Sequence, residues 1–588
     1  MNWDLTKMYN GFEDPAFEAD MKALSEQTDA ANRMIDAIDD GDFCKKLHAL
    51  VELICDAQDR AGKLSSMIFF SLSADTNCAP AIAQRTRFLK LNNELELMLS
   101  RFTARIAQDD RIEACCDADA LLSEHNLFFR NAKEAAAHLI DPALEPVVLK
   151  MRLSGGQAWV RLRDELFSGL TMDVCIDGET KRLPLTAVRA LAYDARPEVR
   201  EAGYKAEIAA YPRIETAMAA CLNGIKAEAN TVAQLKHYDS VLDWSLTESR
   251  MDRETLDALM RAMRESMPMF CHYFRLKNRA LGNEGGLKFQ DLFAPIGNDT
   301  KTYTLEEARD LLVRIFSACY PPIANVMARA FDERLIDAYP REGKEGGAFC
   351  GGVHAIKRAY VLTNFDGAFG SVSTLAHELG HAYQDSRLAE VSPLLCDLPM
   401  PLAETASTFN EYLLAEQILA TADASTAIAI LDEQIGGAAQ VIVDIMSRFL
   451  FESEVVDRCQ EAALSAEELC DIMRRAQLET YGDGLDENYL HPYMWACKPH
   501  YYDTEYHFYN YPYAFGQLFS AGLYALYEKQ GEAFWPMYDA LLTASGSGTI
   551  REVAASAGVD VADTAFWRGA LELYAQKIDR MEALIEKL

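Results

Sequence analysis

The stretch His377-Glu378-Leu379-Gly380-His381 decides how this chain arranges its chemistry. On an α-helix the two histidines lie one turn apart on the same face, close enough to share a metal ion at about 2.0–2.1 Å. Glu378 lies one position round the helix, where its carboxylate can reach a metal-bound water without ligating the metal. Apolar residues that would bury the opposite face recur at helical spacing: Val372, Leu375, Ala376, Leu379 and Tyr383. The motif therefore predicts a metal-site helix with Glu378 as the general base.

A catalytic zinc usually has three protein ligands and a water, so a third ligand is expected beyond this helix. No histidine follows His381 before His491, which disfavours a compact three-histidine site. Glu404 comes after a proline-containing loop that would let a second helix turn back beside the first. We expect His377, His381 and Glu404 to hold one Zn²⁺ per chain. Glu411, two turns further on, is a candidate to orient a ligating histidine from behind, and an exposed helical glutamate is the alternative for it.

Two strand candidates, 348–353 and 359–365, precede the metal-site helix. Glycines flank or interrupt the first strand, and glycine allows another backbone to come close. We therefore expect an extended peptide to add along this edge, and the alternative is a plain glycine-rich turn. The substrate-binding candidates are Ala348, Phe349, Cys350, Gly351 and Gly352.

Tyrosine is concentrated between His500 and Phe515, where it fills six of sixteen positions. The chain average of 25 tyrosines in 588 residues would place about 0.7 there. Peptide hydrolysis forms a tetrahedral oxyanion that phenol or imidazole donors can stabilise, whereas an aromatic core seam is the alternative. The catalytic candidates in this segment are His500, Tyr506, Tyr509, Tyr511 and Tyr513.

The composition is that of a globular protein, with half of the residues hydrophobic and a quarter charged. Acidic residues outnumber basic ones by 90 to 57, and the net charge of −33 argues against a nucleic-acid partner. Fourteen cysteines without a Cys-x-x-Cys pair predict reduced thiols. Because we find no signal-peptide pattern and no run of 18 apolar residues, we expect a cytoplasmic protein that does not enter a membrane.

Helical periodicity dominates the first 150 residues, resumes after a break through about residue 280, and returns after residue 400. Ser154-Gly155-Gly156 breaks it, and Asp177-Gly178 predicts a hairpin turn between strands at 172–176 and 180–185. We therefore expect a mainly α protein with an N-terminal helical region, 1–190, that carries the hairpin, and a catalytic region, 191–588.

Several motifs occur in the order found in one family: the His377–His381 motif, residues 404–411, the strand at 360–364 and the segment 499–514. Together with Trp3-Asp4-Leu5 and residues 156–185 they resemble the oligoendopeptidase F branch of the thimet-oligopeptidase-like zinc metallopeptidases. The resemblance implies a large multi-helix ellipsoid with a deep substrate channel and a small β-sheet beside a zincin-type active-site helix.

The same resemblance implies a hydrolase of peptide degradation, a zinc endopeptidase that cuts internal bonds of short oligopeptides. It makes Glu378 both base and acid, gives the metal to His377, His381 and Glu404, and assigns oxyanion and substrate contacts to His500 and to tyrosines that follow. The spacing from His500 to the last tyrosines is longer than is usual in this branch, so the resemblance does not single out one of them.

Two other functions are compatible with the same residues. An end-trimming carboxypeptidase or dipeptidyl carboxypeptidase would share the metal chemistry, and a non-catalytic peptide-binding protein would use the cleft without turnover. The partners expected in each case are short peptides. The sequence leaves the oligomeric state open, with a monomer as one option.

Overall fold

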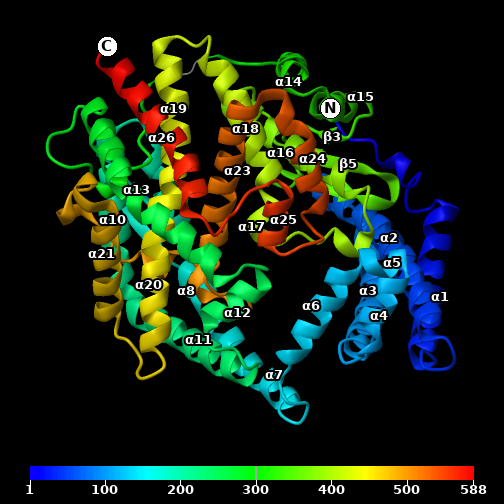
Figure 1. Cartoon of the computed structure of the whole chain (residues 1–588). Coiled ribbons are helices and arrows are strands. Elements are labelled where there is room, and N and C mark those ends of the chain that lie inside the picture. Colours follow the sequence, from blue (N-terminus) through cyan, green and yellow to red (C-terminus); the bar gives the residue numbers. More distant parts are fainter. Residues whose placement is uncertain (298–300, 588) are drawn as a thin grey trace. The chain divides into compact units, whose positions relative to one another are not determined.

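Helices make up most of the chain, as the periodicity predicts (Figure 1). The computed structural model describes residues 1–297 and 301–587. These form two compact units, each assembled from three stretches: unit 1 is Met1–Ala137, Thr300–Ile418 and Leu526–Val559, and unit 2 is His138–Asp299, Leu419–Ala525 and Asp560–Leu588. Compact units thus follow a different division from the predicted regions 1–190 and 191–588. Where the catalytic part of the chain begins stays a prediction.

Unit 1 begins with the predicted N-terminal helices and also holds the metal-site motif. Its elements are α1 (Pro15–Asp36), α2 (Phe43–Ala74), α3 (Ala79–Ile106), α4 (Arg111–Ala118), α5 (Ala120–Glu124), α6 (Asn126–Ala137), α14 (Leu305–Cys319), α15 (Pro321–Asp332), β3 (Ile336–Asp337), β4 (Phe349–Val353), β5 (Arg358–Leu362), α16 (Phe369–Leu388), α17 (Met400–Ala403), α18 (Thr405–Leu419), α24 (Trp535–Ala544) and α25 (Ile550–Ser556). Apolar residues at helical spacing on α2, Leu47, Leu50, Val51 and Ile54, are fully buried.

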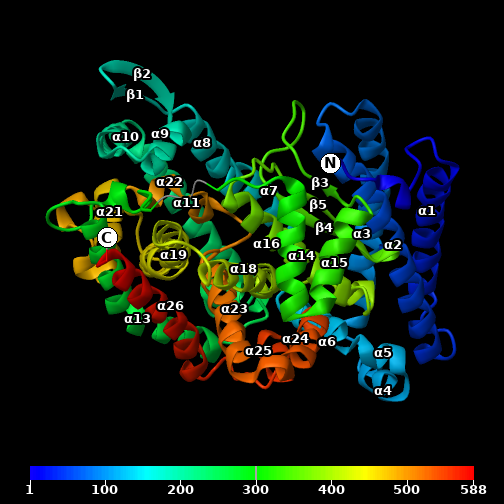
Figure 2. The same ribbon diagram turned by 90° about the horizontal axis from the view of Figure 1, so that it is seen from above.

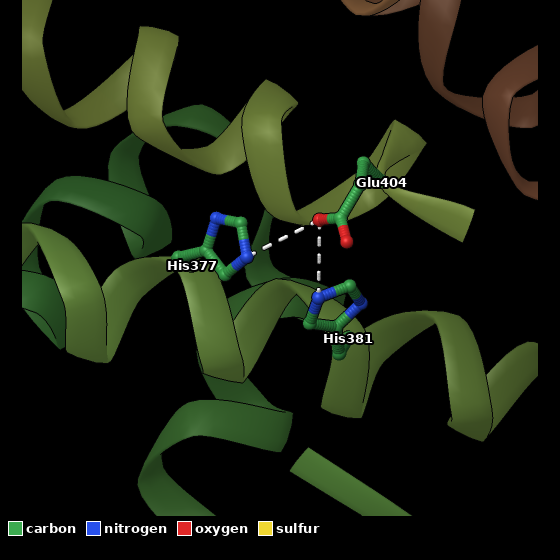
Figure 3. Close-up of side chains that lie close together, drawn as sticks. All are labelled: His377, His381 and Glu404. Carbon is green, nitrogen blue, oxygen red and sulfur yellow. Dashed lines mark ion pairs between the residues drawn. The ribbon is translucent and has the colours of Figure 1, made fainter. Parts of the chain in front are cut away.

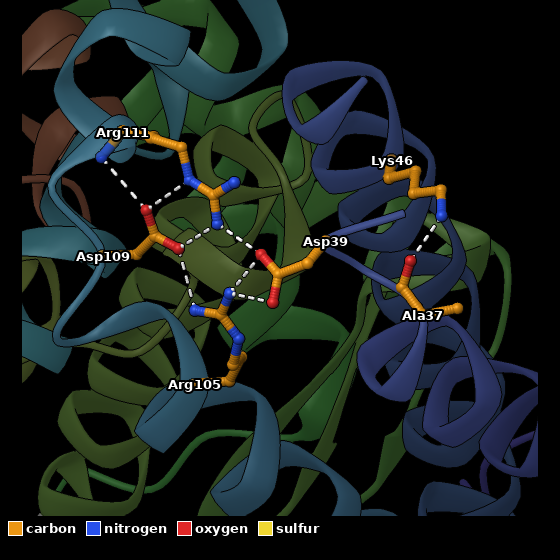
Figure 4. A network of polar contacts seen from close by, with 6 residues as sticks. All are labelled: Ala37, Asp39, Lys46, Arg105, Asp109 and Arg111. Atoms are coloured by element: carbon orange, nitrogen blue, oxygen red, sulfur yellow. Dashed lines mark hydrogen bonds and ion pairs between the residues drawn. The ribbon is translucent and has the colours of Figure 1, made fainter. Parts of the chain in front are cut away.

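Ion pairs and a disulfide link the ends of the N-terminal helices to one another. Arg105 donates to Asp39 (2.7 Å) and Asp109 (2.8 Å), and Arg111 also binds both carboxylates (Figure 4). Close by, the Lys46 ammonium donates to the Ala37 carbonyl.

Cys44 and Cys115 are joined by a disulfide that links α2 to α4. The expectation that every thiol is reduced was therefore wrong for this pair. The two cysteines are 71 residues apart, so sequence spacing did not show that their Cα atoms come within 5.3 Å. The other twelve cysteines are free.

A three-stranded sheet lies beside the metal-site helix, in the order β3-β5-β4. β5 pairs parallel to β3 and antiparallel to β4, with Tyr360 opposite Gly351. Both predicted strands are present within one to three residues of their expected ends. The fold expectation of a mainly helical protein with a small sheet beside the motif helix is thus confirmed.

Unit 2 contains the predicted hairpin, visible at one end of Figure 2. β1 (Thr171–Ile176) and β2 (Glu179–Pro184) pair antiparallel, and Asp177 (φ +56°) and Gly178 (φ +79°) make the turn. Two left-handed residues in a row form the type I′ turn that Asp-Gly predicts. The helices of unit 2 are α7 (Glu145–Ser154), α8 (Gly156–Ser168), α9 (Leu185–Ala190), α10 (Pro197–Ala210), α11 (Glu215–Leu235), α12 (Val241–Glu248), α13 (Arg253–Ala280), α19 (Ala424–Ala439), α20 (Ile445–Arg458), α21 (Ala466–Tyr481), α22 (Met494–Cys497), most of α23 (Tyr511–Gln530) and α26 (Thr564–Ile585).

One helical run among the described residues, Ala424–Arg458, is long and apolar enough to meet the length and composition of a membrane span. It comprises α19, a π-helical turn and α20. More than half of its most apolar window is buried inside the protein, which is common for core helices.

Candidate metal centre

The helix α16 presents the motif because its apolar residues bury the other side. Val372, Leu375, Ala376 and Leu379 are fully buried, as predicted. Just before the helix, the Asp366 carboxylate accepts hydrogen bonds from the Ala368 N–H (2.9 Å) and the Ser371 hydroxyl (2.7 Å). With that face inward, His377 and His381 point away from the core and remain partly accessible.

Gly380 lets the second ligand-bearing segment come close. A Cβ atom at this position would lie 2.6 Å from both the Ala406 carbonyl oxygen and the Ser407 Cα. Real Cβ atoms do not approach backbone so closely, so any side chain here would push α18 away from α16. The motif's second variable position, Gly380, therefore sets the distance between the two helices. Sequence reasoning missed this role, although a glycine inside a helix was a visible signal.

The three predicted ligands meet at one point of unit 1 (Figure 3). The Glu404 Oε2 atom lies 3.2 Å from His377 Nε2 and 3.3 Å from His381 Nε2. Two atoms that bind zinc at about 2.0–2.1 Å with a tetrahedral angle are about 3.4 Å apart, so these separations suit a shared ion. All three ligand atoms lie within 4.8 Å of one another, the only such group among the described residues.

Other side chains orient this triad from behind. Glu411 Oε1 accepts a hydrogen bond from His377 Nδ1, which leaves Nε2 directed at Glu404. Ser407 donates to Glu404 Oε2 at 2.7 Å. Carboxylate support of a ligating imidazole fixes its tautomer and increases its basicity. Glu411 thus contacts His377, and its role in orienting a metal ligand stays a prediction.

The electrostatics of the triad favour a cation. Burial opposes the charged form of His377, but hydrogen bonds to Glu404 and Glu411 outweigh it and raise the pKa of the imidazole to about 10. Burial acts against the charged form of Glu404 as well, yet the His377 and His381 side chains hold the pKa of its carboxyl well below the usual range. Two imidazoles and an ionised carboxylate that converge in this way form a donor set suited to zinc.

Glu378 is next to the triad but not part of it. Its side chain is 6% exposed, and burial raises the pKa of its carboxyl above the ordinary value. A carboxyl whose pKa moves toward neutrality can both accept and release a proton near pH 7.

The candidate substrate strand β4 is an edge strand among the described residues, since it pairs with β5 alone. A Cβ at Gly351 would meet the Phe70 ring at 2.7 Å, and one at Gly352 would meet the Asp385 carboxylate at 2.7 Å. These glycines are therefore explained by the close packing of β4 against α2 and against α16. Our interpretation that they admit a substrate backbone is not needed to explain them.

The predicted aromatic segment lies in unit 2, and its candidate residues have different surroundings. Tyr511 is buried, and its hydroxyl contacts Ser249 Oγ (3.0 Å) and the Ser245 carbonyl (3.2 Å), so it serves the core. The others form an aromatic cluster, which we define as His500, Tyr506, Tyr509 and Tyr513. Within it the His500 ring stacks on Tyr509 at 5.1 Å, and Tyr509 contacts Tyr506 and Tyr513 at 5.8 Å.

The aromatic cluster combines exposed phenols with a neutral imidazole. Tyr506 is 55% and Tyr513 38% exposed. Burial, aided by Arg448 and Lys498, lowers the pKa of His500 to about 4, which keeps its ring uncharged at neutral pH.

A buried ion pair anchors the segment that carries this cluster. Lys226 Nζ and Glu452 Oε1 are 2.6 Å apart and fully buried, and the same carboxylate oxygen accepts from the Phe508 N–H at 3.2 Å. Phe508 is left-handed (φ +53°), a conformation that a phenylalanine rarely adopts unless its surroundings enforce it. Sequence reasoning missed this anchor, because its partners are 226 residues apart.

Comparison with known proteins places these observations in a family context. The sequence profile of peptidase family M3 matches residues 190–573. Curated relatives include an oligoendopeptidase F homolog of Lactococcus lactis subsp. lactis, 29% identical over 66% of this chain and 64% of the relative. Another is oligopeptidase PepF of Bacillus subtilis, 26% identical over 66% of this chain and 58% of the relative. The chain thus spans less than two thirds of the length of these relatives.

Solved structures resemble the whole described chain. A Chlamydophila abortus protein matches with a TM-score of 0.88 at 20% identity, over 99% of this chain and 98% of the other. Oligoendopeptidase-F from Enterococcus faecium matches with a TM-score of 0.69 at 20% identity, over 97% and 99%. At such identities the likeness establishes the fold.

Proposed function

Because this chain belongs to peptidase family M3 and brings His377, His381 and Glu404 together, we propose that it is a zinc-dependent endopeptidase that hydrolyses internal bonds of short peptides. The convergence of the three side chains on one point carries this proposal. Relatives named for oligoendopeptidase activity support the reaction class.

In this mechanism His377, His381 and Glu404 hold the ion. Zinc, when bound, lowers the pKa of a water and polarises the scissile carbonyl. Glu378 accepts a proton from the attacking water and delivers it to the departing amine, for which its raised pKa is suited. Glu411 keeps His377 in the tautomer that offers Nε2.

We propose that the substrate lies extended along β4 and that the aromatic cluster contributes donors to it. Support for the first part is the unpaired edge of β4. Support for the second is that His500 is neutral and that Tyr506 and Tyr513 are exposed, whereas the hydroxyl of Tyr511 is engaged in the core. Tyr506→Phe or Tyr513→Phe should lower kcat more than it raises KM, and Tyr511→Phe should not.

Two carboxylate variants test the metal and the base separately. Glu404→Ala should lose bound zinc and activity together. Glu378→Gln should keep zinc but lose at least about a hundredfold in kcat, because an amide cannot take the proton. Glu390→Gln, an exposed glutamate just beyond α16, is the matched control and should behave as wild type. Full zinc occupancy in Glu404→Ala, or rapid turnover by Glu378→Gln, would refute the assigned roles.

We also propose that the protein acts in the cytoplasm. Support is its low cysteine density, with one disulfide among fourteen cysteines. Cell fractionation should recover the peptidase with a cytosolic marker, and recovery from the exterior or the membrane would contradict this.

A further inference from the structure

Unit 2 contains a cavity with a volume of about 350 Å³. It lies between α9, α10, the 3₁₀ turn Phe289–Asp291 and the segment 491–498. Small-molecule sites typically measure about 300–1,000 Å³, so this cavity suits a small ligand. Its lining includes no member of the metal triad or of the aromatic cluster.

The negative charge of Glu207, the carboxylate in the cavity lining, is already paired with positive groups. Glu207 Oε1 accepts from Arg189 Nη1 (2.6 Å) and the Tyr211 hydroxyl (2.8 Å), and His491 Nε2 lies 3.1 Å away. Burial opposes ionisation, but His491 and Arg189 outweigh it and lower the pKa of Glu207 to about 2. Glu207 therefore offers no further negative charge to a cation in the cavity.

Arg200, which also lines the cavity, is paired with a buried carboxylate. Arg200 donates to Asp291 at 2.8 Å and to the carbonyls of Asp194 and Ala195. The positive charge of Arg200 is thus already paired within the protein.

Lys498 is the cation of this cavity that the wall does not balance. Its side chain makes no hydrogen bond or ion pair of ordinary length with the residues that the structure describes. Partial burial lowers the pKa of its amine, and the Asp444 carboxylate, which opposes this effect, is itself hydrogen-bonded to Arg448. A partly buried ammonium without a dedicated counter-ion is costly, and a bound anion would reduce that cost.

Other lining groups specify more of the ligand. The Gln290 side chain is 4% exposed, and its Oε1 has no hydrogen-bond partner in the part of the chain that is described, so it can accept an N–H. Tyr193, which is 63% exposed, contacts Phe293 with ring centroids 4.9 Å apart. These rings offer a flat apolar surface at the cavity.

We propose that this cavity binds small carboxylates that carry an N–H group and an aromatic ring, such as acylated aromatic amino acids or short peptides that end in an aromatic residue. The carboxylate binds Lys498, the N–H donates to Gln290 Oε1, and the ring packs against Tyr193 and Phe293. No residue assigned to the proposed peptidase site lines this cavity, although Lys498 also contributes to the low pKa of His500.

Isothermal titration calorimetry of N-acetyl-L-phenylalanine into the full, zinc-loaded chain tests the proposal. The uncharged N-acetyl-L-phenylalaninamide is the matched ligand and should bind at least about tenfold more weakly, as expected for loss of a charge-assisted hydrogen bond. Repeating the titration on Glu404→Ala separates this site from any carboxylate binding at the metal, and the affinity should persist there. Failure of the peptidase assignment would leave this result unchanged.

Variants of the cavity complete the test. Lys498→Met and Gln290→Leu should each weaken binding of the acid, the first by at least about tenfold. Lys236→Met is the control, because Lys236 is another half-buried lysine of unit 2 and lies over Trp244, outside this cavity. Equal affinity for acid and amide, no binding by the wild type up to about 10 mM, or an unchanged affinity in Lys498→Met would overturn the proposal.

Discussion

At the scale of single residues, Gly380 shows how one absent side chain can set the geometry of a metal site. The backbone of α18 passes where a Cβ would stand, 2.6 Å from Ala406 O. Glu404 immediately precedes that helix, so its carboxylate reaches the histidines only while the close approach holds.

Gly380→Ala should therefore destabilise the protein by about 1–3 kcal/mol and weaken zinc binding, because overpacking must separate α16 from α18. Gly370→Ala is a control in the same helix, where an added Cβ meets nothing within 4 Å. That change should be neutral or stabilise by up to about 1 kcal/mol, since alanine is the better helix former. Equal effects of the two variants on urea unfolding and zinc affinity would show that the close approach has no consequence.

The convergence of the three candidate ligands was predictable from the sequence, whereas the contacts that support them were not. His377 and His381 follow from helical spacing alone, and Glu404 follows from the need for a third ligand. The contacts of Gly380 with Ala406, and of Glu452 with Lys226, join segments whose proximity only the folded chain reveals. The disulfide Cys44–Cys115 was missed for the same reason.

At the scale of elements, the loop between α16 and α17 is fastened by one histidine. His354 Nδ1 is 2.6 Å from Asp59 Oδ1, and His354 Nε2 is 2.9 Å from the Val391 carbonyl oxygen. Both ring nitrogens face acceptors, so both must donate and the ring must be an imidazolium. Asp59 and Cys396 outweigh the effect of burial and raise the pKa of His354 to about 10.

This pairing predicts a pH-dependent stability. Because the folded pKa of about 10 lies above the unfolded value of about 6.5, the contribution is complete below pH 6.5 and is lost as the pH rises toward 10. A pKa change of this size corresponds to about 5 kcal/mol at most. Urea unfolding of wild type, His354→Gln and Asp59→Asn at several pH values measures it. The difference in the free energy of unfolding between wild type and each variant should shrink as the pH rises from 6.5 toward 10. A constant or growing difference would contradict the pairing.

The buried ion pair of Lys226 and Glu452 supports the segment that carries the aromatic cluster. Glu452→Gln would leave Lys226 charged and unpaired, which should cost about 3–5 kcal/mol. It should also lower kcat, because the Phe508 backbone loses an ionised acceptor and the cluster shifts. Glu454→Gln, two residues along α20, removes a surface pair with Arg475 and should cost less than about 1 kcal/mol. Similar costs for both variants would show that the anchor is not needed.

At the scale of the whole molecule, the chain assembles each compact unit from three separate stretches. Local periodicity predicted helices, hairpin and strands well, because those patterns depend on neighbours in sequence. It did not predict which stretches would join, since that depends on faces brought together over hundreds of residues. The metal triad is nevertheless complete within unit 1, because all its ligands come from one continuous stretch.

The edge of β4 and the convergence of His377, His381 and Glu404 support the central proposal, which is metal-dependent cleavage inside an extended peptide. The most direct test is the rate of cleavage of an internally quenched peptide that is blocked at both ends, measured with zinc-free protein before and after one equivalent of zinc. We predict no cleavage before zinc addition, and cleavage at an internal bond once one ion per chain is bound. Cleavage by the zinc-free protein, or activity that requires a free peptide end, would contradict the account.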